Sequence, residues 1–313
     1  MDSTDFTKRA WVEKYRPMSL NDISSHTQII KILRKFLSSH TLPHLCFYGP
    51  PGTGKTSTCV ALARELYGEH YRAMVLELNA SDDRGIGVVR TTIKEFASTC
   101  PFNLDGIKLV ILDEADAMTN EAQLALRRMV ELYSNNVRFC LICNYLTKII
   151  DPLQSRCVKF KFNTLESADI KARIDFITKN EGIVLEKGVK SALIRECGSD
   201  MRAIVNALQA AATTSTTIHL DLMYEVLGKV KPSVMDEFWE NLECHTLKDN
   251  MRWIEVARCQ GLSIHSFVEA LSPLVIATRN DTYITRLSKI EEYLSRDSIG
   301  SIYWRPLLSL RIS

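Results

Sequence analysis

Residues 49–56 read Gly-Pro-Pro-Gly-Thr-Gly-Lys-Thr, a combination that can hold the phosphates of a nucleotide. They fit the pattern G-x-x-x-x-G-K-[ST], in which glycines let backbone N–H groups turn toward phosphate oxygens. Lys55 adds a positive charge for the β- and γ-phosphates, and Thr56 supplies a hydroxyl for Mg²⁺. The sequence therefore predicts a site for a nucleoside triphosphate and Mg²⁺.

A pair of carboxylates indicates the chemistry that follows binding. Asp113 and Glu114 come directly after the apolar run at residues 109–112. Asp113 can hold Mg²⁺, usually through water, and Glu114 can polarise the water that attacks the γ-phosphate. Asn144 ends a later apolar run and could reach the same phosphate or its water, because ligands of open α/β sheets bind at the carboxyl ends of strands. This set predicts phosphoryl transfer to water.

Alternating strands and helices are needed to position these side chains. Helical periodicity predicts a helix at residues 119–133, where Asn120 and Gln123 have the spacing of a capping box. Further helices are expected at residues 28–37, 57–67 and 86–97. Apolar runs predict buried strands at residues 45–48, 74–79, 108–113 and 138–144, with an outer strand at residues 158–162. Strands that alternate with helices in this way predict a parallel sheet.

The composition changes after residue 165, where no further strand pattern is convincing. Helices are expected at residues 169–180, 189–197, 201–212 and 220–227, and the chain reads as helical again after Pro232. We therefore expect an α/β part followed by an all-α part, with domains at residues 1–164, 165–230 and 231–313.

Charge, hydropathy and cysteine content narrow the class of protein. The formal net charge is +2, so a nucleic-acid surface would have to be a local patch. No apolar stretch is long enough to span a bilayer, and residues 1–9 are too polar for a signal peptide. The nine cysteines lack framework spacing. Cys140 and Cys143 would face opposite sides of one strand, so we interpret them as small buried hydrophobes and not as zinc ligands. Free thiols favour the cytosol or nucleus.

The assembled motifs resemble those of AAA+ ATPases and, more narrowly, those of the small subunits of the replication factor C clamp loader. Among these subunits, residues 139–146 are most similar to the smallest, motif-complete one. The resemblance covers most of residues 11–205 and is carried by Trp-Val-Glu-Lys-Tyr-Arg-Pro at 11–17 and by residues 47–57, 76–86, 111–118, 125–128 and 155–157. It implies an AAA+ core over residues 1–164, a helical lid and a helical collar that holds subunits together.

The resemblance also implies roles for individual residues around ATP and Mg²⁺. Asn144 and Arg202 would be the two sensors of the γ-phosphate. Thr56 and Asp113 would hold Mg²⁺. The adenine would pack along Val12, Tyr15, Arg16 and Pro17, and the phosphates would lie in the loop formed by Gly49, Pro50, Pro51, Gly52, Thr53, Gly54, Lys55, Thr56 and Ser57.

Arg156 is the residue for which spacing and resemblance disagree. By spacing alone it reads as an ordinary surface arginine in a salt bridge. In the resemblance, Ser-Arg-Cys at residues 155–157 is an arginine-finger motif, which implies that Arg156 acts in trans at the ATP site of a neighbouring subunit.

The resemblance implies three kinds of partner: four other clamp-loader subunits in a hetero-pentamer, a sliding clamp ring and primer-template DNA. It implies no association with a membrane, and it implies a location in the nucleus. Arg84, Arg90 and Lys94 would face the phosphates of the DNA. The loop around Phe102 is expected either to contact the clamp or to pack locally.

The family pattern is not complete in this chain. The lid motif reads Gly-Ser-Asp-Met-Arg-Ala at residues 198–203, where the family usually has Gly-Asp-Met-Arg-Arg, and Leu124 replaces a usual Asn. Two alternatives stay open: a structural subunit that binds ATP without turnover, and another AAA+ ATPase that remodels DNA. The sequence Asp-Glu-Ala-Asp at residues 113–116 also suggests a helicase, but here it is only a variant of the acidic strand-end motif. A helicase needs a second RecA-like domain, for which the helical region leaves no room.

Overall fold

The computed structural model describes residues 10–23, 25–39, 41–81, 85–99, 106–237, 268–272 and 288, with the backbone alone at residues 85–90. The chain divides into two compact units. The first contains residues 1–181 and 197–206, and the second contains residues 182–196 and 207–313. The predicted boundaries at residues 164 and 230 stay a prediction.

A parallel sheet organises the first unit. Its strands are β1 (Leu45–Tyr48), β2 (Val75–Asn79), β3 (Lys108–Asp113), β4 (Val137–Cys143) and β5 (Val158–Lys161). They are hydrogen-bonded in the order β2-β3-β4-β1-β5, so β5 lies at an edge, as the sequence predicts. In register, Phe47 of β1 pairs with Ile142 of β4, and Ile111 of β3 pairs with Cys140 of β4. The polar carboxyl ends of β1, β3 and β4 therefore lie next to one another.

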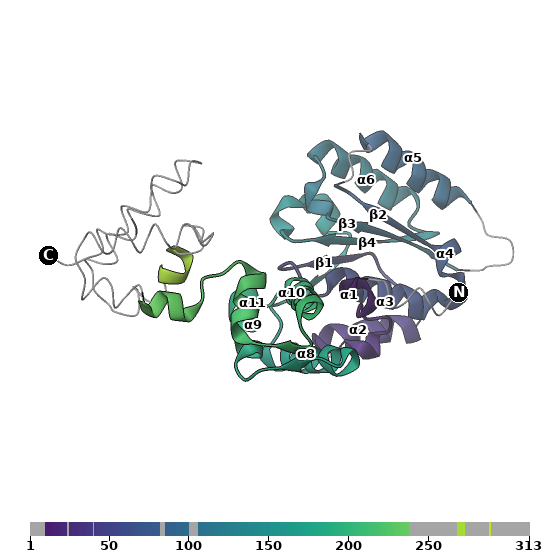
Figure 1. Ribbon diagram of the computed structural model, residues 1–313. Helices are drawn as coiled ribbons and strands as arrows, with labels where there is room; N and C mark the ends of the chain where they lie inside the picture. Colours follow the sequence, from purple (N-terminus) through teal and green to yellow (C-terminus); the bar gives the residue numbers. More distant parts are fainter. Residues whose placement is uncertain are drawn as a thin grey trace. The chain divides into compact units, whose positions relative to one another are not determined.

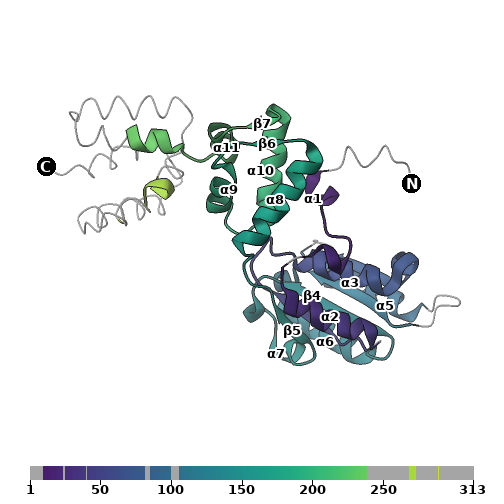
Figure 2. The ribbon, with the colours of Figure 1, turned by 90° about the horizontal axis from the view of Figure 1, so that it is seen from below.

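Helices cover both faces of this sheet (Figures 1 and 2). On one face, α2 (Thr27–Ser38) and α3 (Lys55–Tyr67) contribute Leu33 and Leu62 to a core built on Phe47. On the other face, α5 (Gly85–Ser98) and α6 (Asn120–Leu132) contribute Ile93 and Leu126 to a second core. Apolar side chains that repeat with the helical period thus bury one stripe of each helix against the strands.

The remaining helical elements of the first unit connect these layers or follow them. Single short turns are found at α1 (Trp11–Lys14), α4 (Tyr71–Met74) and α7 (Asp151–Gln154), and 3₁₀ turns at Leu20–Asp22, Gly68–His70, Ala115–Ala117 and Leu146–Lys148. α8 (Ser167–Glu181) is long and buries Ile170, Ile174 and Ile177. The segment at residues 11–17 begins with the helical turn α1.

Elements of the second unit, and those that join it to the first, are mainly helical. They are α9 (Val189–Cys197), α10 (Met201–Thr214) and α11 (Leu220–Leu227), together with the two-residue strands β6 (Val184–Leu185) and β7 (Thr217–Ile218). β6 and β7 pair in parallel, which the sequence did not predict because two residues carry no alternation (Figure 2). Most of residues 238–313, the predicted collar, lie outside the described residues.

The expected capping box of α6 is wrong. Thr119 is the N-cap, and its hydroxyl accepts a hydrogen bond from the N–H of Ala122. The side chain of Gln123 is buried instead. Its amide donates to the carbonyls of Met118 and Lys148 and accepts from the N–H of Ile150. Gln123 therefore joins α6 to the chain after β4, and its burial outweighed the local capping pattern.

The described cysteines are free thiols: Cys46, Cys59, Cys140, Cys143, Cys157 and Cys197. Cys140 packs in the core beneath α3, and Cys143 packs in the core beneath α6, so the two face opposite sides of β4 as expected. No group of three His, Cys, Asp or Glu side chains suited to a metal is found in the described part of the chain. Within the same residues, no helix has the length and hydropathy that crossing a membrane requires.

Candidate functional site

The phosphate loop connects β1 to the first turn of α3, and two of its glycines are required by close packing. Gly49 has φ +146°, and a Cβ there would lie 2.0 Å from the carbonyl oxygen of Phe162. Gly52 has φ +69°, and its Cβ would lie 2.0 Å from Oδ1 of Asp200. Both approaches exclude any other residue, so the loop is held between the end of β5 and the start of α10.

Lys55 is buried at the first position of α3, with only 7% of its surface exposed. Its Nζ donates to the carbonyls of Gly49 at 2.7 Å and Pro50 at 2.8 Å, and to Oδ1 of Asn144 at 2.9 Å. Burial lowers the pKa of Lys55, while the carboxylate of Asp113 acts in the opposite direction. The contact to Asn144 joins the phosphate loop to the end of β4.

The residues predicted to bind Mg²⁺ are also brought together. Oγ1 of Thr56 donates to Oδ2 of Asp113 over 2.7 Å, so a hydroxyl and a carboxylate meet at the ends of α3 and β3. Hard oxygen ligands of this kind fit Mg²⁺. Glu114 follows in the left-handed region at φ 52°, with its N–H bonded to Oδ1 of Asp113. This uncommon backbone conformation leaves the carboxylate of Glu114 exposed beside the loop.

Asp116 contributes to the site although no sequence motif predicts a role of its own for it. Its Oδ2 accepts hydrogen bonds from the N–H of Asn144 at 3.3 Å and of Tyr145 at 3.2 Å. The carboxylate thus holds the backbone at the end of β4, where Asn144 turns toward Lys55. The spacing of Asp116 within Asp-Glu-Ala-Asp carries no signal for such a long-range contact.

Arg202 lies in the first turn of α10, which Asp200 caps. Oδ1 of Asp200 accepts from the N–H groups of Arg202 at 2.9 Å and Ala203 at 3.2 Å. The N–H of Met201 reaches the carbonyl of Gly52 at 3.4 Å. Despite the extra serine in the lid motif, Arg202 is therefore next to the phosphate loop, and its charge lowers the pKa of Lys55.

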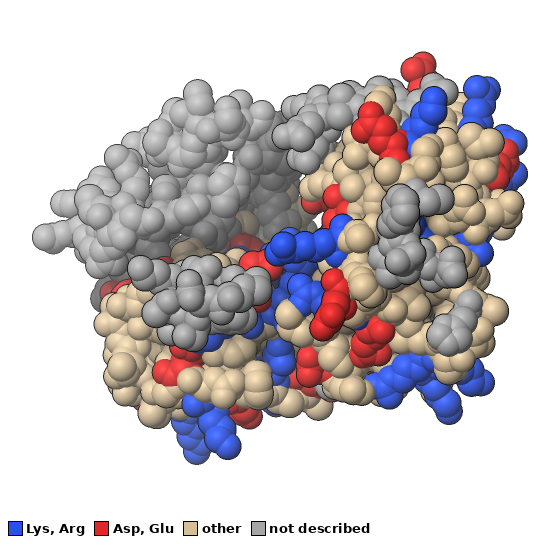
Figure 3. Space-filling view, turned by 90° about the vertical axis from the view of Figure 1, so that its right-hand side faces the viewer, with Lys and Arg blue, Asp and Glu red and all other residues tan. Residues whose placement is uncertain are grey.

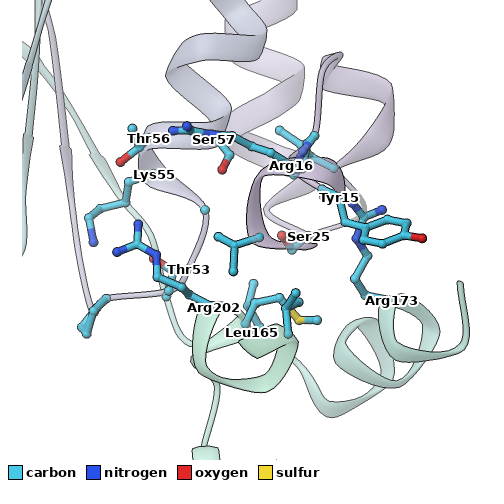
Figure 4. A pocket seen from close by; sticks show the side chains of 18 of the residues that line it. Tyr15, Arg16, Ser25, Thr53, Lys55, Thr56, Ser57, Leu165, Arg173 and Arg202 are labelled. Carbon is cyan, nitrogen blue, oxygen red and sulfur yellow. Dashed lines mark hydrogen bonds between the residues drawn. The ribbon is translucent and has the colours of Figure 1, made fainter. Parts of the chain in front are cut away.

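One pocket contains nearly all the predicted nucleotide-binding residues. Figure 4 shows Lys55 and Thr56 at one end, with Arg202 beside them, and Tyr15 and Arg173 at the other end. Its lining includes Val12, Tyr15, Arg16, Pro17, Pro51, Gly52, Thr53, Gly54, Lys55, Thr56, Ser57, Asp113, Glu114, Asn144 and Arg202. Gly49 and Pro50 do not line it and act through their carbonyls on Lys55. Asp22, Ser25, Asp169 and Arg173 line it as well, and no sequence motif identified them.

Arg156 does not line this pocket. Its guanidinium pairs with Glu131 through Nη2, and its Nη1 donates to the carbonyl of Pro152 at 2.6 Å. Nε of Arg127 binds the same Oε1 of Glu131 at 3.1 Å. The salt bridge favoured by spacing alone is therefore present, and the role of Arg156 at a neighbouring subunit stays a prediction.

The predicted DNA-binding residues are only partly described. Arg84 lies outside the described residues, and so does the side chain of Arg90, while Lys94 is exposed on α5. Phe102 is also outside the described residues. Figure 3 shows Lys and Arg interspersed with Asp and Glu on the face in view, which agrees with a net charge near zero.

Replacing Lys55 with Ala should weaken ATP binding by roughly ten- to a hundredfold, because a hydrogen bond to a charged group contributes about 1.5–3 kcal/mol. Titration with a fluorescent ATP analogue measures the loss, and Lys171→Ala, an exposed position on α8, is the control. Far-UV circular dichroism should be unchanged. Equal dissociation constants for wild type and Lys55→Ala would contradict the phosphate-binding role.

Comparisons with known proteins agree with this geometry. A family model described as "ATPase family associated with various cellular activities (AAA)" matches residues 45–165. Replication factor C subunit 3 of Schizosaccharomyces pombe is 49% identical over 291 residues, which cover 91% of this chain and 85% of that protein. Replication factor C subunit 3 of Saccharomyces cerevisiae is 42% identical over 318 residues, which cover 94% of this chain and 92% of that protein. The replication factor C small subunit of Thermofilum pendens is 48% identical over 245 residues, which cover 78% of this chain and 74% of that protein.

Among solved structures, the RuvB Holliday junction branch migration motor of Thermotoga maritima is similar, with a TM-score of 0.55. The match covers 73% of this chain and 80% of that one at 16% identity. At this identity the similarity concerns the fold alone.

Proposed function

The chain belongs to the family of replication factor C small subunits, and we propose that it helps to open a sliding clamp and load it onto primer-template DNA in replication and repair. It is an AAA ATPase and a clamp-loader subunit, and it binds nucleotide. The observation that carries the proposal is the cluster of Lys55, Thr56, Asp113 and Asn144 at the ends of adjacent strands and of α3. Such a cluster suits a γ-phosphate and its metal ion.

Within this function, ATP would be bound with Mg²⁺, the ion lying against Thr56 and Asp113. Mg²⁺ would supply charge neutralisation between the β- and γ-phosphates. Glu114 would orient and polarise the attacking water, and Asn144 and Arg202 would contact the γ-phosphate. The adenine would pack along Val12, Tyr15, Arg16 and Pro17, which line the far part of the same pocket.

The subunit would act inside a hetero-pentamer with four related ATPases, in the nucleus. Residues 1–164 would be the AAA+ core, residues 165–230 the lid and residues 231–313 the collar that joins the subunits. Arg156 would complete the ATP site of a neighbour. Because an ATP site of this kind needs an arginine from another subunit, ATP hydrolysis should depend on assembly of the complex.

ATPase assays of the chain alone and of the chain with its partners test the proposal. We expect almost no turnover from the isolated chain, and turnover stimulated by the other subunits, the clamp and primed DNA. A chain that binds ATP but contributes no turnover to the complete assembly would instead be a structural subunit. Copurification with four related ATPases from a native extract is expected, and copurification with none would contradict the proposal.

Replacing both Arg90 and Lys94 with Ala should weaken DNA binding by the assembled complex equally for all sequences. Phosphate contacts carry no base preference, and each lost contact should flatten the slope of log K against log salt by about one. Fluorescence anisotropy at several salt concentrations measures both effects. Lys31→Ala with Lys35→Ala is the matched control, since both are exposed one turn apart on α2. An unchanged slope, or a sequence-dependent loss, would contradict the phosphate role.

A further inference from the structure

Helix α8 contacts the segment at residues 11–17 through Tyr15 and the neighbouring Lys14. The phenol of Tyr15 donates to Oε1 of Glu181 at 2.5 Å, and Nη2 of Arg173 donates to the backbone carbonyl of Tyr15. The ring of Tyr15 also meets the ring of Phe176 edge-on, with the centroids 6.1 Å apart. One helix therefore binds both the phenol and the backbone carbonyl of Tyr15.

Charged groups strengthen this attachment. Nζ of Lys14 lies 2.6 Å from the same Oε1 of Glu181, and the side chains of Lys14 and Glu181 are 27% and 18% exposed. Burial by itself raises the pKa of Glu181, but the hydrogen bonds from Lys14 and Tyr15 leave it lower than usual. Burial raises the pKa of Tyr15, and the hydrogen bond to Glu181 raises it further. At neutral pH a carboxylate thus accepts from a phenol and an ammonium group, a strong arrangement.

The segment needs such external support because it has little structure of its own. α1 has a single turn, and isolated turns of helix are unstable because their nucleation is unfavourable. Arg16 precedes a proline, which favours an extended backbone and ends the turn. The position of this segment in the pocket therefore depends on the contacts that Lys14 and Tyr15 make with α8.

We propose that Glu181 and Arg173 are positioning residues for the nucleotide base. They hold Tyr15, and through it the segment at residues 11–17, in the place that receives the base. Figure 4 shows Tyr15 and Arg173 at the end of the pocket away from Lys55. This inference rests on the proposed function, in which that segment packs along the adenine. Its consequence is that the two residues affect affinity for the base and leave affinity for the phosphates unchanged.

Binding of ATP, ADP and inorganic tripolyphosphate to the full chain separates the two contributions. In Glu181→Gln, affinity for ATP and ADP should fall together by roughly tenfold, the size of one charge-assisted hydrogen bond. Affinity for tripolyphosphate, measured by displacement of a fluorescent ATP analogue, should stay at the wild-type value. Lys55→Ala should lower the affinity for ATP, ADP and tripolyphosphate alike. Glu166→Gln, an exposed carboxylate just before α8, is the matched control and should change none of them.

A double-mutant cycle tests whether Glu181 acts through Tyr15. Tyr15→Phe keeps the ring and removes only the phenol oxygen. If the two residues act through one bond, Tyr15→Phe with Glu181→Gln should lose less ATP affinity than the sum of the single losses. Arg173→Gln should show the same selective loss, which keeps the inference testable if Glu181→Gln folds poorly.

The outcomes separate the inference from the function on which it rests. Unchanged ATP affinity in Glu181→Gln and Arg173→Gln, or an equal loss for tripolyphosphate, would overturn the positioning role alone. The positioning role would also be overturned if the double variant lost as much ATP affinity as the sum of the losses in Tyr15→Phe and Glu181→Gln. A wild-type chain that binds neither ATP nor tripolyphosphate would overturn the proposed function, and the positioning role with it.

Discussion

Glu114→Gln should bind ATP and Mg²⁺ as the wild type does and hydrolyse ATP about 10²–10⁴-fold more slowly, the usual contribution of a general base. Glutamine keeps the shape and hydrogen-bonding capacity of the side chain but cannot polarise the attacking water as a carboxylate does. Glu114 follows Asp113 directly, and its left-handed backbone at φ 52° presents its side chain to the pocket that Thr56 and Lys55 line. The effect should therefore appear in turnover and not in affinity.

Two measurements on the assembled complex check this expectation. Steady-state phosphate release should fall at the site of this chain, and the complex should stay bound to DNA together with the clamp, because ATP persists. Glu121→Gln, an exposed carboxylate in the first turn of α6, is the matched control and should release phosphate at the wild-type rate. Wild-type turnover in Glu114→Gln would mean that Glu114 is not the base or that this site is catalytically idle.

The parts of this site that the sequence predicts are those that local pattern determines. Strand, loop and helix follow one another around residues 45–67, and the acidic pair ends its own strand, so periodicity places each residue at a strand end. The parallel topology then brings Asn144 to Lys55 and Asp113 to Thr56. They meet because the carboxyl ends of parallel strands share one edge of the sheet.

Contacts between distant segments could not be predicted in the same way. Glu181 and Tyr15 are far apart in the chain, and neither belongs to a pattern that names the other. Gln123 has correct capping spacing, yet it is buried and joins two loops, because tertiary contacts satisfy more hydrogen bonds than a local cap offers. β6 and β7 are held by pairing with each other and are too short to show alternation.

Arg156→Ala should leave ATP binding at the chain's own Lys55 site unchanged and should strongly slow hydrolysis at the neighbouring subunit's site. An arginine finger stabilises the charge that develops on the γ-phosphate oxygens, and it contributes about 10³–10⁵ in rate in GTPases. A smaller effect is expected here, since assembly and not chemistry can limit turnover. Arg156 lines no part of its own pocket, which is consistent with a role outside the chain.

The contact between Arg156 and Glu131 provides a strict comparison for this prediction. Arg127 binds the same Oε1 of Glu131, so Arg127→Ala removes an equivalent surface ion pair without touching Arg156. If Arg156 were only a structural partner of Glu131, the two variants would behave alike. If Arg156 is an arginine finger, ATP hydrolysis at the neighbouring subunit's site should stay near the wild-type rate in Arg127→Ala. In Arg156→Ala that rate should fall strongly.

The decisive assembly contains one active ATP site, that of the neighbour which Arg156 would contact, with the other sites inactivated. Phosphate release and clamp loading are measured on primed DNA for wild type, Arg156→Ala, Arg156→Lys and Arg127→Ala. Arg156→Lys should recover only part of the rate, because an ammonium group keeps the charge but lacks the planar fork that matches phosphate oxygens. Unchanged turnover in Arg156→Ala would show that Arg156 is not a finger. A collapse of the mutant chain's own nucleotide affinity would show that it acts in cis, and the proposed ring geometry would then be wrong.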